Sequence, residues 1–131
     1  MRKKLKVKVR VPATAANLGA GFNCLGLALE LYNILEISEI NSGINIKILG
    51  EGKNALPKNR SNLSLNAMYK VFDICGYIPK GLKIKMHNRI PIARGLGSSA
   101  AAIVAGAVAA NELCAKKLSR DDLIQLCADL E

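Results

Sequence analysis

The sequence has no tryptophan, few aromatic residues and few acidic ones. Only 4% of its 131 residues are aromatic, so it lacks the stacking rings on which single-stranded nucleic-acid platforms depend. With 19 Lys and Arg against 10 Asp and Glu, the formal net charge is +9. Such a charge suits a nucleic-acid binder, an enzyme for anionic substrates, or part of a protein whose remainder is acidic. Half of the residues are hydrophobic, which excludes an intrinsically disordered tail.

Metal-binding patterns, export signals and membrane spans are also missing. The four cysteines never form Cys-x-x-Cys and His87 is the sole histidine, so we expect no zinc site. The longest apolar stretch, residues 100–110, is too short for a bilayer, which takes about 17–25 residues. No apolar segment follows the basic N-terminus, so no signal peptide is expected. We therefore predict a cytoplasmic protein with reduced thiols and no membrane contact.

The hydrophobic pattern alternates between strand and helix periods along a chain whose length suits one domain. Gly, Ala and Asn enrichment predicts a loop over residues 12–22. Segments 34–40 and 43–49 are predicted to form a strand, turn, strand pair. Strands and helices mix without strict alternation, which predicts the α+β class. The predicted strands cover residues 5–11, 34–40, 43–49 and 81–86, and the predicted helices cover 61–75, 98–118 and the segment from Ser119 onward.

The loop at residues 91–102, which reads PIARGLGSSAAA, lies between a predicted strand and a predicted helix. Gly95 and Gly97 would let the backbone approach an anion closely, and the helix start would offer free N–H groups at a positive dipole end. Ser98 and Ser99 add hydroxyls that can also ligate a hard cation such as Mg²⁺. The Walker lysine and the third glycine of a dinucleotide fingerprint are missing. From these residues alone, a phosphate cradle and an ordinary turn before a helix both stay open.

Two segments of the sequence resemble signature motifs of one enzyme family. Residues 91–101 are similar to the phosphate-binding motif of the GHMP kinases. Residues 11–29, which read VPATAANLGAGFNCLGLAL, are similar to the N-terminal motif of the homoserine kinases within that superfamily. The resemblance extends over essentially the whole chain. It implies an α+β fold like the GHMP kinase N-terminal domain, which is itself like ribosomal protein S5 domain 2. It also implies ATP-dependent phosphorylation of the L-homoserine hydroxyl to O-phosphohomoserine, in threonine biosynthesis.

The resemblance assigns the ATP and Mg²⁺ ligands to particular residues. Ser99 matches the serine that ligates Mg²⁺ in such kinases, and Glu131 matches the acidic ligand, with Asp129 as a competing assignment. By its residue type, Ser99 could instead cap the following helix. No residue is placed by motif as a catalytic base, so positioning and charge neutralisation are expected to drive the reaction. The ATP phosphates would lie on Pro91, Arg94, Gly95, Leu96, Gly97, Ser98, Ser99 and Ala100.

Three asparagines match the other ligand positions of the family. Asn62 matches a residue near the adenine, although an Asn before a predicted helix suits an N-cap equally well. Asn17 and Asn23 match the positions that contact homoserine, although Asn17 could simply support its own loop. The family usually has Asp at position 23, where a carboxylate would pair with the ammonium of an amino acid. Asn23 therefore leaves the substrate less firmly defined.

The family is longer than this chain, which bears on what the chain does alone. We expect residues 1–131 to be the N-terminal ATP-binding portion of a GHMP-type kinase, with the C-terminal domain absent and the isolated chain inactive. A homodimer is a family-level expectation. The alternatives are another GHMP kinase of the mevalonate or sugar type, or an RNA-binding module like S5. Since RNA binding leaves the Gly-Leu-Gly-Ser-Ser loop unexplained, we expect no nucleic-acid partner.

Overall fold

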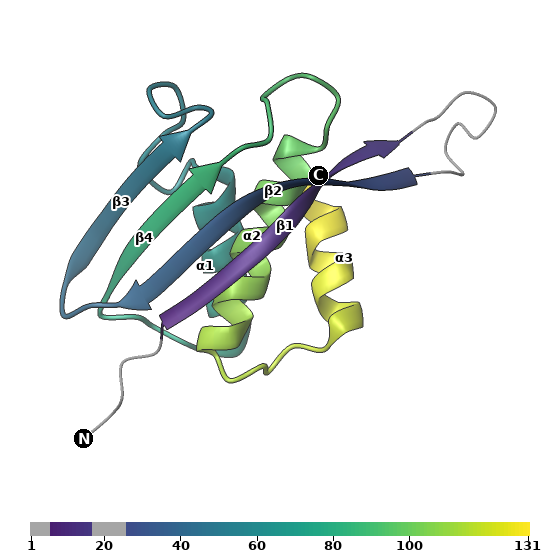
Figure 1. Ribbon diagram of the computed structural model, residues 1–131. Helices are drawn as coiled ribbons and strands as arrows, with labels where there is room; N and C mark the ends of the chain where they lie inside the picture. The colour runs from purple at the N-terminus through teal and green to yellow at the C-terminus, as the bar shows by residue number, and fades with distance from the viewer. Residues whose placement is uncertain (1–5, 17–25) are drawn as a thin grey trace.

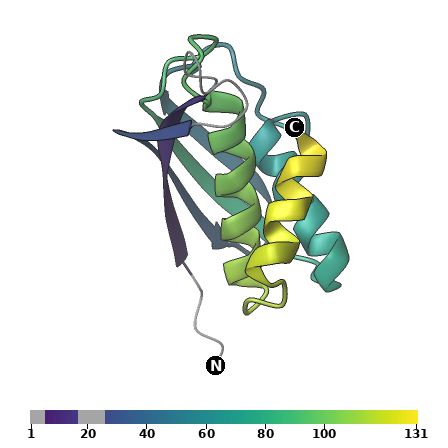
Figure 2. The ribbon, with the colours of Figure 1, turned by 90° about the vertical axis from the view of Figure 1, so that its right-hand side faces the viewer.

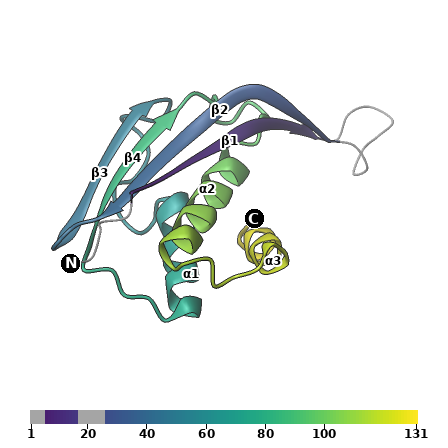
Figure 3. The same ribbon diagram turned by 60° about the horizontal axis from the view of Figure 1, so that its bottom comes forward.

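A single mixed sheet with helices on one face forms the structure. The computed structural model describes residues 6–16 and 26–131. The helices pack against one face of the sheet, and the other face has none among the described residues (Figures 1 and 3). This arrangement confirms the predicted α+β class. The strands are β1 (Lys6–Ala16), β2 (Gly26–Glu39), β3 (Gly43–Gly50) and β4 (Gly81–Asn88), in the spatial order β1-β2-β4-β3, and the helices are α1 (Leu63–Cys75), α2 (Ser98–Leu113) and α3 (Arg120–Leu130).

The first two strands are longer than the sequence pattern predicts. The loop predicted from residue 12 is wrong as far as Ala16, because β1 continues to that residue and Thr14 pairs with Ala28 of β2. β1 tolerates Pro12 because it is an edge strand, where a missing N–H need not break the ladder. The register shifts between Pro12 and Thr14. β1 and β2 thereby extend together beyond the other two strands (Figure 1).

The predicted pairing of the segments on either side of residues 41–43 is also wrong. β4 lies between β2 and β3, antiparallel to the first and parallel to the second. Ile84 of β4 is opposite both Ile37 of β2 and Ile46 of β3. A parallel pair requires a crossover connection, and α1 supplies it. Alternation along a strand shows which face is buried but not which strand is its neighbour, so the sequence pattern could not exclude a hairpin here.

The boundaries of the helices follow local capping chemistry. Gly76 ends α1 in the left-handed region at φ 67°, as the sequence predicts. The predicted helix over residues 98–118 is too long: α2 ends at Leu113, and Ala115 and Lys116 have φ near 60°. The buried Asn111 holds the turn, since its side chain accepts from the Leu118 N–H and donates to the Leu118 carbonyl, both at 3.0 Å. No described helix is long and apolar enough to cross a membrane.

The hydrophobic core lies between the sheet and the helices α1 and α2. α3 has no fully buried residue and begins with the predicted capping box of Ser119 and Asp122. α1 and α2 approach so closely that a Cβ on Gly106 would overlap the backbone carbonyl of Ser64. The Ser64 hydroxyl also donates to the Ala102 carbonyl at 2.8 Å. The largest fully buried side chains are those of Ile37, Leu65, Met68, Val71, Phe72, Leu82, Ile84 and Ile90.

Candidate functional site

The loop between β4 and α2 has an alternating backbone conformation. Ala93, Gly95 and Gly97 all have positive φ, at 60°, 69° and 73°, whereas Arg94 and Leu96 do not. A positive φ at Ala93 is uncommon for a residue that carries a side chain. Alternation between the left-handed region and negative φ turns successive N–H groups toward one side, which makes a concave nest for an anion. The loop therefore has the backbone shape of a phosphate cradle.

Strand β1 holds this loop against the sheet. The Thr14 N–H donates to the Leu96 carbonyl at 2.9 Å. A Cβ on Gly97 would overlap the Thr14 hydroxyl oxygen, so a larger residue there would require the Thr14 side chain or the loop to shift. The continuation of β1 beyond Pro12, which sequence patterning did not predict, is what brings Thr14 to this place.

The first turn of α2 leaves its N–H groups available to a ligand. Its N-cap is Gly97, which forms no side-chain capping bond. The amides of Ser98, Ser99 and Ala100 begin the helix, where N–H groups have no partner within the helix. The first turn contains no acidic residue to offset the positive end of the helix dipole.

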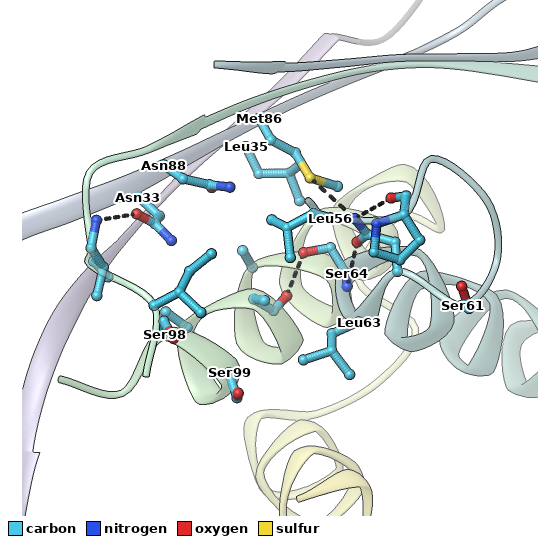
Figure 4. Close-up of a pocket in the computed structure, with 17 residues that line it drawn as sticks. Asn33, Leu35, Leu56, Ser61, Leu63, Ser64, Met86, Asn88, Ser98 and Ser99 are labelled. Atoms are coloured by element: carbon cyan, nitrogen blue, oxygen red, sulfur yellow. Dashed lines mark hydrogen bonds between the residues drawn. The ribbon is translucent and has the colours of Figure 1, made fainter. Parts of the chain in front are cut away.

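The side chains of the loop differ in how far they reach solvent. Ser99 is exposed and is not the N-cap, so the capping alternative is wrong for it. Its hydroxyl points away from the apolar side chains of the neighbouring pocket (Figure 4). Ser98 and Pro91 are half-buried, and Arg94 is exposed at the tip of the loop. The exposed Ser99 hydroxyl can therefore coordinate a cation or donate a hydrogen bond to an anion without breaking an existing capping bond.

A pocket of about 130 Å³ opens beside the cradle. It is smaller than the roughly 300–1,000 Å³ of sites that enclose drug-sized ligands, so it can admit only part of a nucleotide. None of the described residues that line it is ionisable. Its polar groups come from the middle of β2, the carboxyl end of β4, the segment that leads into α1, and the starts of α1 and α2 (Figure 4). Residues with polar side chains around the pocket are Asn33, Ser61, Asn62, Ser64, Asn88, Ser98 and Ser99.

Asn62 lines this pocket, but its side chain already bonds to the protein. It is the N-cap of α1, with Oδ1 accepting from the Ser64 N–H at 3.0 Å. Its Nδ2 donates to the Pro57 carbonyl at 2.9 Å and contacts the Met86 sulfur at 3.7 Å. The N-cap alternative for Asn62 is thus confirmed. That Asn62 lies near the adenine stays a prediction. Its amide is already bonded at both ends, so Asn62 would shape the pocket wall and would not donate a free amide to the ligand.

Asn33 is a site residue that the sequence reasoning missed. It lies in β2, is 8% exposed, and its Oδ1 accepts from the N–H groups of Arg89 and Ile90 at 2.8 and 2.9 Å. These bonds fix the chain where it leaves β4 for the phosphate loop. The signal in the sequence was an amide between Tyr32 and Ile34 in an otherwise apolar run, since a buried amide needs specific partners.

The resemblance assigns Glu131 or Asp129 to Mg²⁺ and Asn17 and Asn23 to homoserine. The carboxyl end of α3, which carries Asp129 and Glu131, lies at the same end of the molecule as the start of α2 (Figure 2). Asp129 accepts from the Gln125 side chain at 2.8 Å, and Glu131 is exposed. No group of three or more His, Cys, Asp or Glu side chains gathers as a metal site in residues 6–16 and 26–131. Asn17 and Asn23 lie outside the described residues.

Proteins with related sequences include homoserine kinases of several bacteria. The homoserine kinase of Petrotoga mobilis is 50% identical over 125 residues, which cover 95% of this chain and 41% of that protein. The homoserine kinase of Caldicellulosiruptor bescii is also 50% identical over 125 residues, covering 95% of this chain and 40% of that protein. The chain therefore spans about two-fifths of the length of these curated relatives.

Solved structures show the same fold. The homoserine kinase of Cytophaga hutchinsonii superposes with a TM-score of 0.82 at 31% identity, over 96% of this chain and 41% of that one. The mevalonate kinase of Methanococcus jannaschii matches with a TM-score of 0.74 at 24% identity, over 97% of this chain and 46% of that one, which shows the fold alone.

A family model identifies the domain independently of these pairwise similarities. The model described as "GHMP kinases N terminal domain" matches residues 62–131. This segment runs from the N-cap of α1 through the phosphate loop and α2 to the end of α3, so it includes the cradle and one wall of the pocket. Because the match covers more than half of the 131 residues, the chain belongs to the GHMP kinase family.

Proposed function

We propose that this chain is the ATP-binding portion of a kinase that transfers the terminal phosphoryl group of ATP to the hydroxyl of L-homoserine. One observation above all others supports the binding of ATP. The alternating φ at Ala93, Gly95 and Gly97 leads directly into the uncapped start of α2, and such a sequence of N–H groups suits phosphate oxygens. The relatives named homoserine kinase, at 50% identity, support the substrate.

The cradle would act on the phosphates through its backbone. In this proposal the amides of residues 95–100 donate to phosphate oxygens, while Leu96 is held in place by its bond from Thr14. Hydroxyl and carboxylate oxygens suit Mg²⁺, so Ser99 and either Glu131 or Asp129 would hold that ion. When bound, Mg²⁺ neutralises phosphate charge. The protein supplies fixed donors that need no rearrangement as charge develops during transfer.

Catalysis without a dedicated base fits the composition of the pocket. Its described lining consists of amides, hydroxyls and apolar side chains, with no carboxylate, histidine or lysine. Phosphoryl transfer relies mainly on positioning and charge neutralisation. We propose that the site holds ATP and substrate in line, with Asn17 and Asn23 contacting homoserine. A cytoplasmic location and a homodimer belong to the same proposal.

The test compares substrates in the natural protein that contains this chain. ADP release is measured at saturating Mg-ATP with L-homoserine, mevalonate or galactose as the acceptor, and the product is identified by mass spectrometry. We expect O-phosphohomoserine and a rate with homoserine at least a hundredfold above the other two. A faster reaction with mevalonate or galactose would assign the protein to another branch of the family. No ATP-dependent phosphorylation of any acceptor would refute the kinase proposal.

A further inference from the structure

The side-chain amide of Asn33 binds the protein through its oxygen, and its nitrogen faces the pocket. Both N–H groups that it binds, those of Arg89 and Ile90, can only donate, so the atom that accepts them must be Oδ1. The orientation of the amide is therefore fixed, and Nδ2 lies on the opposite side. Within the described part of the chain, Nδ2 has no hydrogen-bond partner.

The position of Nδ2 makes it available to a ligand. No buried side-chain nitrogen or oxygen of the described residues lacks a partner, so Nδ2, which has none, must reach open space. The space beside it is the pocket that Asn33 lines together with Ser98. The close-up shows the amide nitrogen of Asn33 directed into this pocket (Figure 4). A ligand that fills the pocket would exclude water from Nδ2. A ligand without an acceptor would then leave this donor unpaired at a cost in free energy, so a ligand with an acceptor at this point should bind more tightly.

The other end of the amide acts on the loop. Ile90 immediately precedes Pro91, where the phosphate loop begins, and only seven positions, residues 91–97, separate it from α2. Ile90 is fully buried, so the two bonds from Asn33 hold a rigid point of the chain. A displacement of the Ile90 backbone would therefore also displace Gly95 and Gly97.

We propose that Asn33 is a positioning residue for the nucleotide: its Oδ1 sets the entry of the phosphate loop, and its Nδ2 donates a hydrogen bond to an acceptor atom of the nucleotide in the pocket. The inference rests on the proposed kinase function. It differs from a purely structural role, in which Oδ1 would hold the loop and Nδ2 would have no ligand.

Two variants separate the two ends of the amide. Asn33→Asp keeps an acceptor for both backbone N–H groups and removes the donor, whereas the similarly shaped Asn33→Leu removes both. Since Asn33→Asp also brings a negative charge near phosphate, Asn88→Asp serves as the matched control. Asn88 lines the same pocket and its Nδ2 donates to the Glu51 carbonyl at 3.2 Å. Asn88→Asp therefore brings the same charge to the pocket, while the donor that it loses bonds to the protein and not to a ligand.

The first measurement is KM for ATP and kcat in the natural protein that contains this chain, with titration calorimetry of Mg-ATP. We expect Asn33→Asp to melt within a few degrees of wild type and to raise KM for ATP about tenfold or more beyond Asn88→Asp, the usual effect of a lost hydrogen bond to a charged or buried partner. Equal effects of the two Asp variants would overturn the donor role.

The second measurement needs no nucleotide. Amide hydrogen exchange at Arg89 and Ile90 is followed in the ligand-free protein, where Asn33→Leu should accelerate exchange at least tenfold and Asn33→Asp should not. Unchanged exchange in Asn33→Leu would overturn the role of Oδ1. If wild-type protein fails to bind Mg-ATP in the first measurement, the proposed function fails and the donor role with it, whereas the exchange result still decides the role of Oδ1.

Discussion

Single residues of the phosphate loop are constrained by their immediate neighbours. Gly97 has positive φ and also lies where a Cβ would overlap the Thr14 hydroxyl, whereas Gly95 has positive φ with nothing within 4 Å. Glycine is therefore required at position 95 by the backbone conformation alone, and at position 97 by both the conformation and the lack of space. The sequence motif indicated that both matter but could not show this difference, because Thr14 is 83 positions away in the chain.

Replacing each glycine by alanine should have unequal effects. Gly95→Ala should lower the free energy of unfolding by about 1 kcal/mol, the usual cost of left-handed backbone for a residue with a side chain. Gly97→Ala should cost about 1–3 kcal/mol more, since the loop or the Thr14 side chain must shift to relieve the overlap, and it should also weaken Mg-ATP binding. Urea unfolding and calorimetry of both variants check this. Equal losses would show that the contact with Thr14 does not restrict the loop.

Ser99 is expected to affect chemistry without affecting stability. Its side chain is exposed and does not cap α2, so Ser99→Ala should change the free energy of unfolding by no more than about 0.5 kcal/mol. If Ser99 ligates Mg²⁺, kcat should fall by at least tenfold. The rate is compared with that of Ser38→Ala, on the helix-free face of the sheet, which should match wild type. An unchanged kcat in Ser99→Ala would exclude the metal role.

The thiol of Cys114 should make stability depend on alkaline pH. Burial, together with the neighbouring Cys75, raises its pKa from an ordinary value of 9.0 to about 12. Between these values the unfolded chain loses the thiol proton while the folded chain retains it. The stabilisation is therefore complete below pH 9 and is lost as the pH rises toward 12. Urea unfolding at pH 8 and pH 10 should show a fall that is smaller in Cys114→Ala. Equal falls in both proteins would contradict this pKa.

Secondary-structure elements were predictable where local chemistry defines them. The end of α1 at Gly76 and the capping box at Ser119 follow from short-range hydrogen bonds, which sequence spacing encodes. The end of α2 was missed because it depends on the Asn111 side chain binding the backbone of Leu118, seven residues further on, which no short capping motif encodes. The parallel pairing of β3 with β4 was missed because it depends on the crossover through α1. Local signals thus gave the elements, and tertiary contacts determined their lengths and neighbours.

The crossing of α1 and α2 offers a test at this scale. Alanine in place of glycine usually stabilises a helix interior by about 1 kcal/mol. At Gly106 a Cβ would overlap the backbone carbonyl of Ser64, which cannot rotate away as a side chain could. We expect the overlap to dominate, so that Gly106→Ala lowers the free energy of unfolding by about 1–3 kcal/mol. A more stable Gly106→Ala variant in urea unfolding would mean that the two helices can separate freely.

At the scale of the molecule, one cluster of positive charge among the described residues lies on the sheet, away from the candidate site. The helix-free face of the sheet carries exposed lysines on β1, β3 and β4, and cross-strand pairing aligns Lys8, Glu36, Lys85 and Lys47 in one row. The pocket lining that the structure describes has no ionisable residue, and Arg94 is the only cation of the loop at residues 91–97. The net charge of +9 is therefore not mainly a property of the phosphate cradle. The family and the cradle could be predicted from motifs, whereas this distribution required the sheet register.

The most direct test of the account is which backbone amides respond to nucleotide. Amide chemical shifts of the isotope-labelled natural protein that contains this chain are followed by NMR during titration with Mg-ATP. We predict that the largest shifts occur at residues 95–100, with small ones at Lys83 and Lys85 on the helix-free face. If residues 95–100 do not shift while the lysines of that face do, the loop is an ordinary turn and the anion site lies on the sheet.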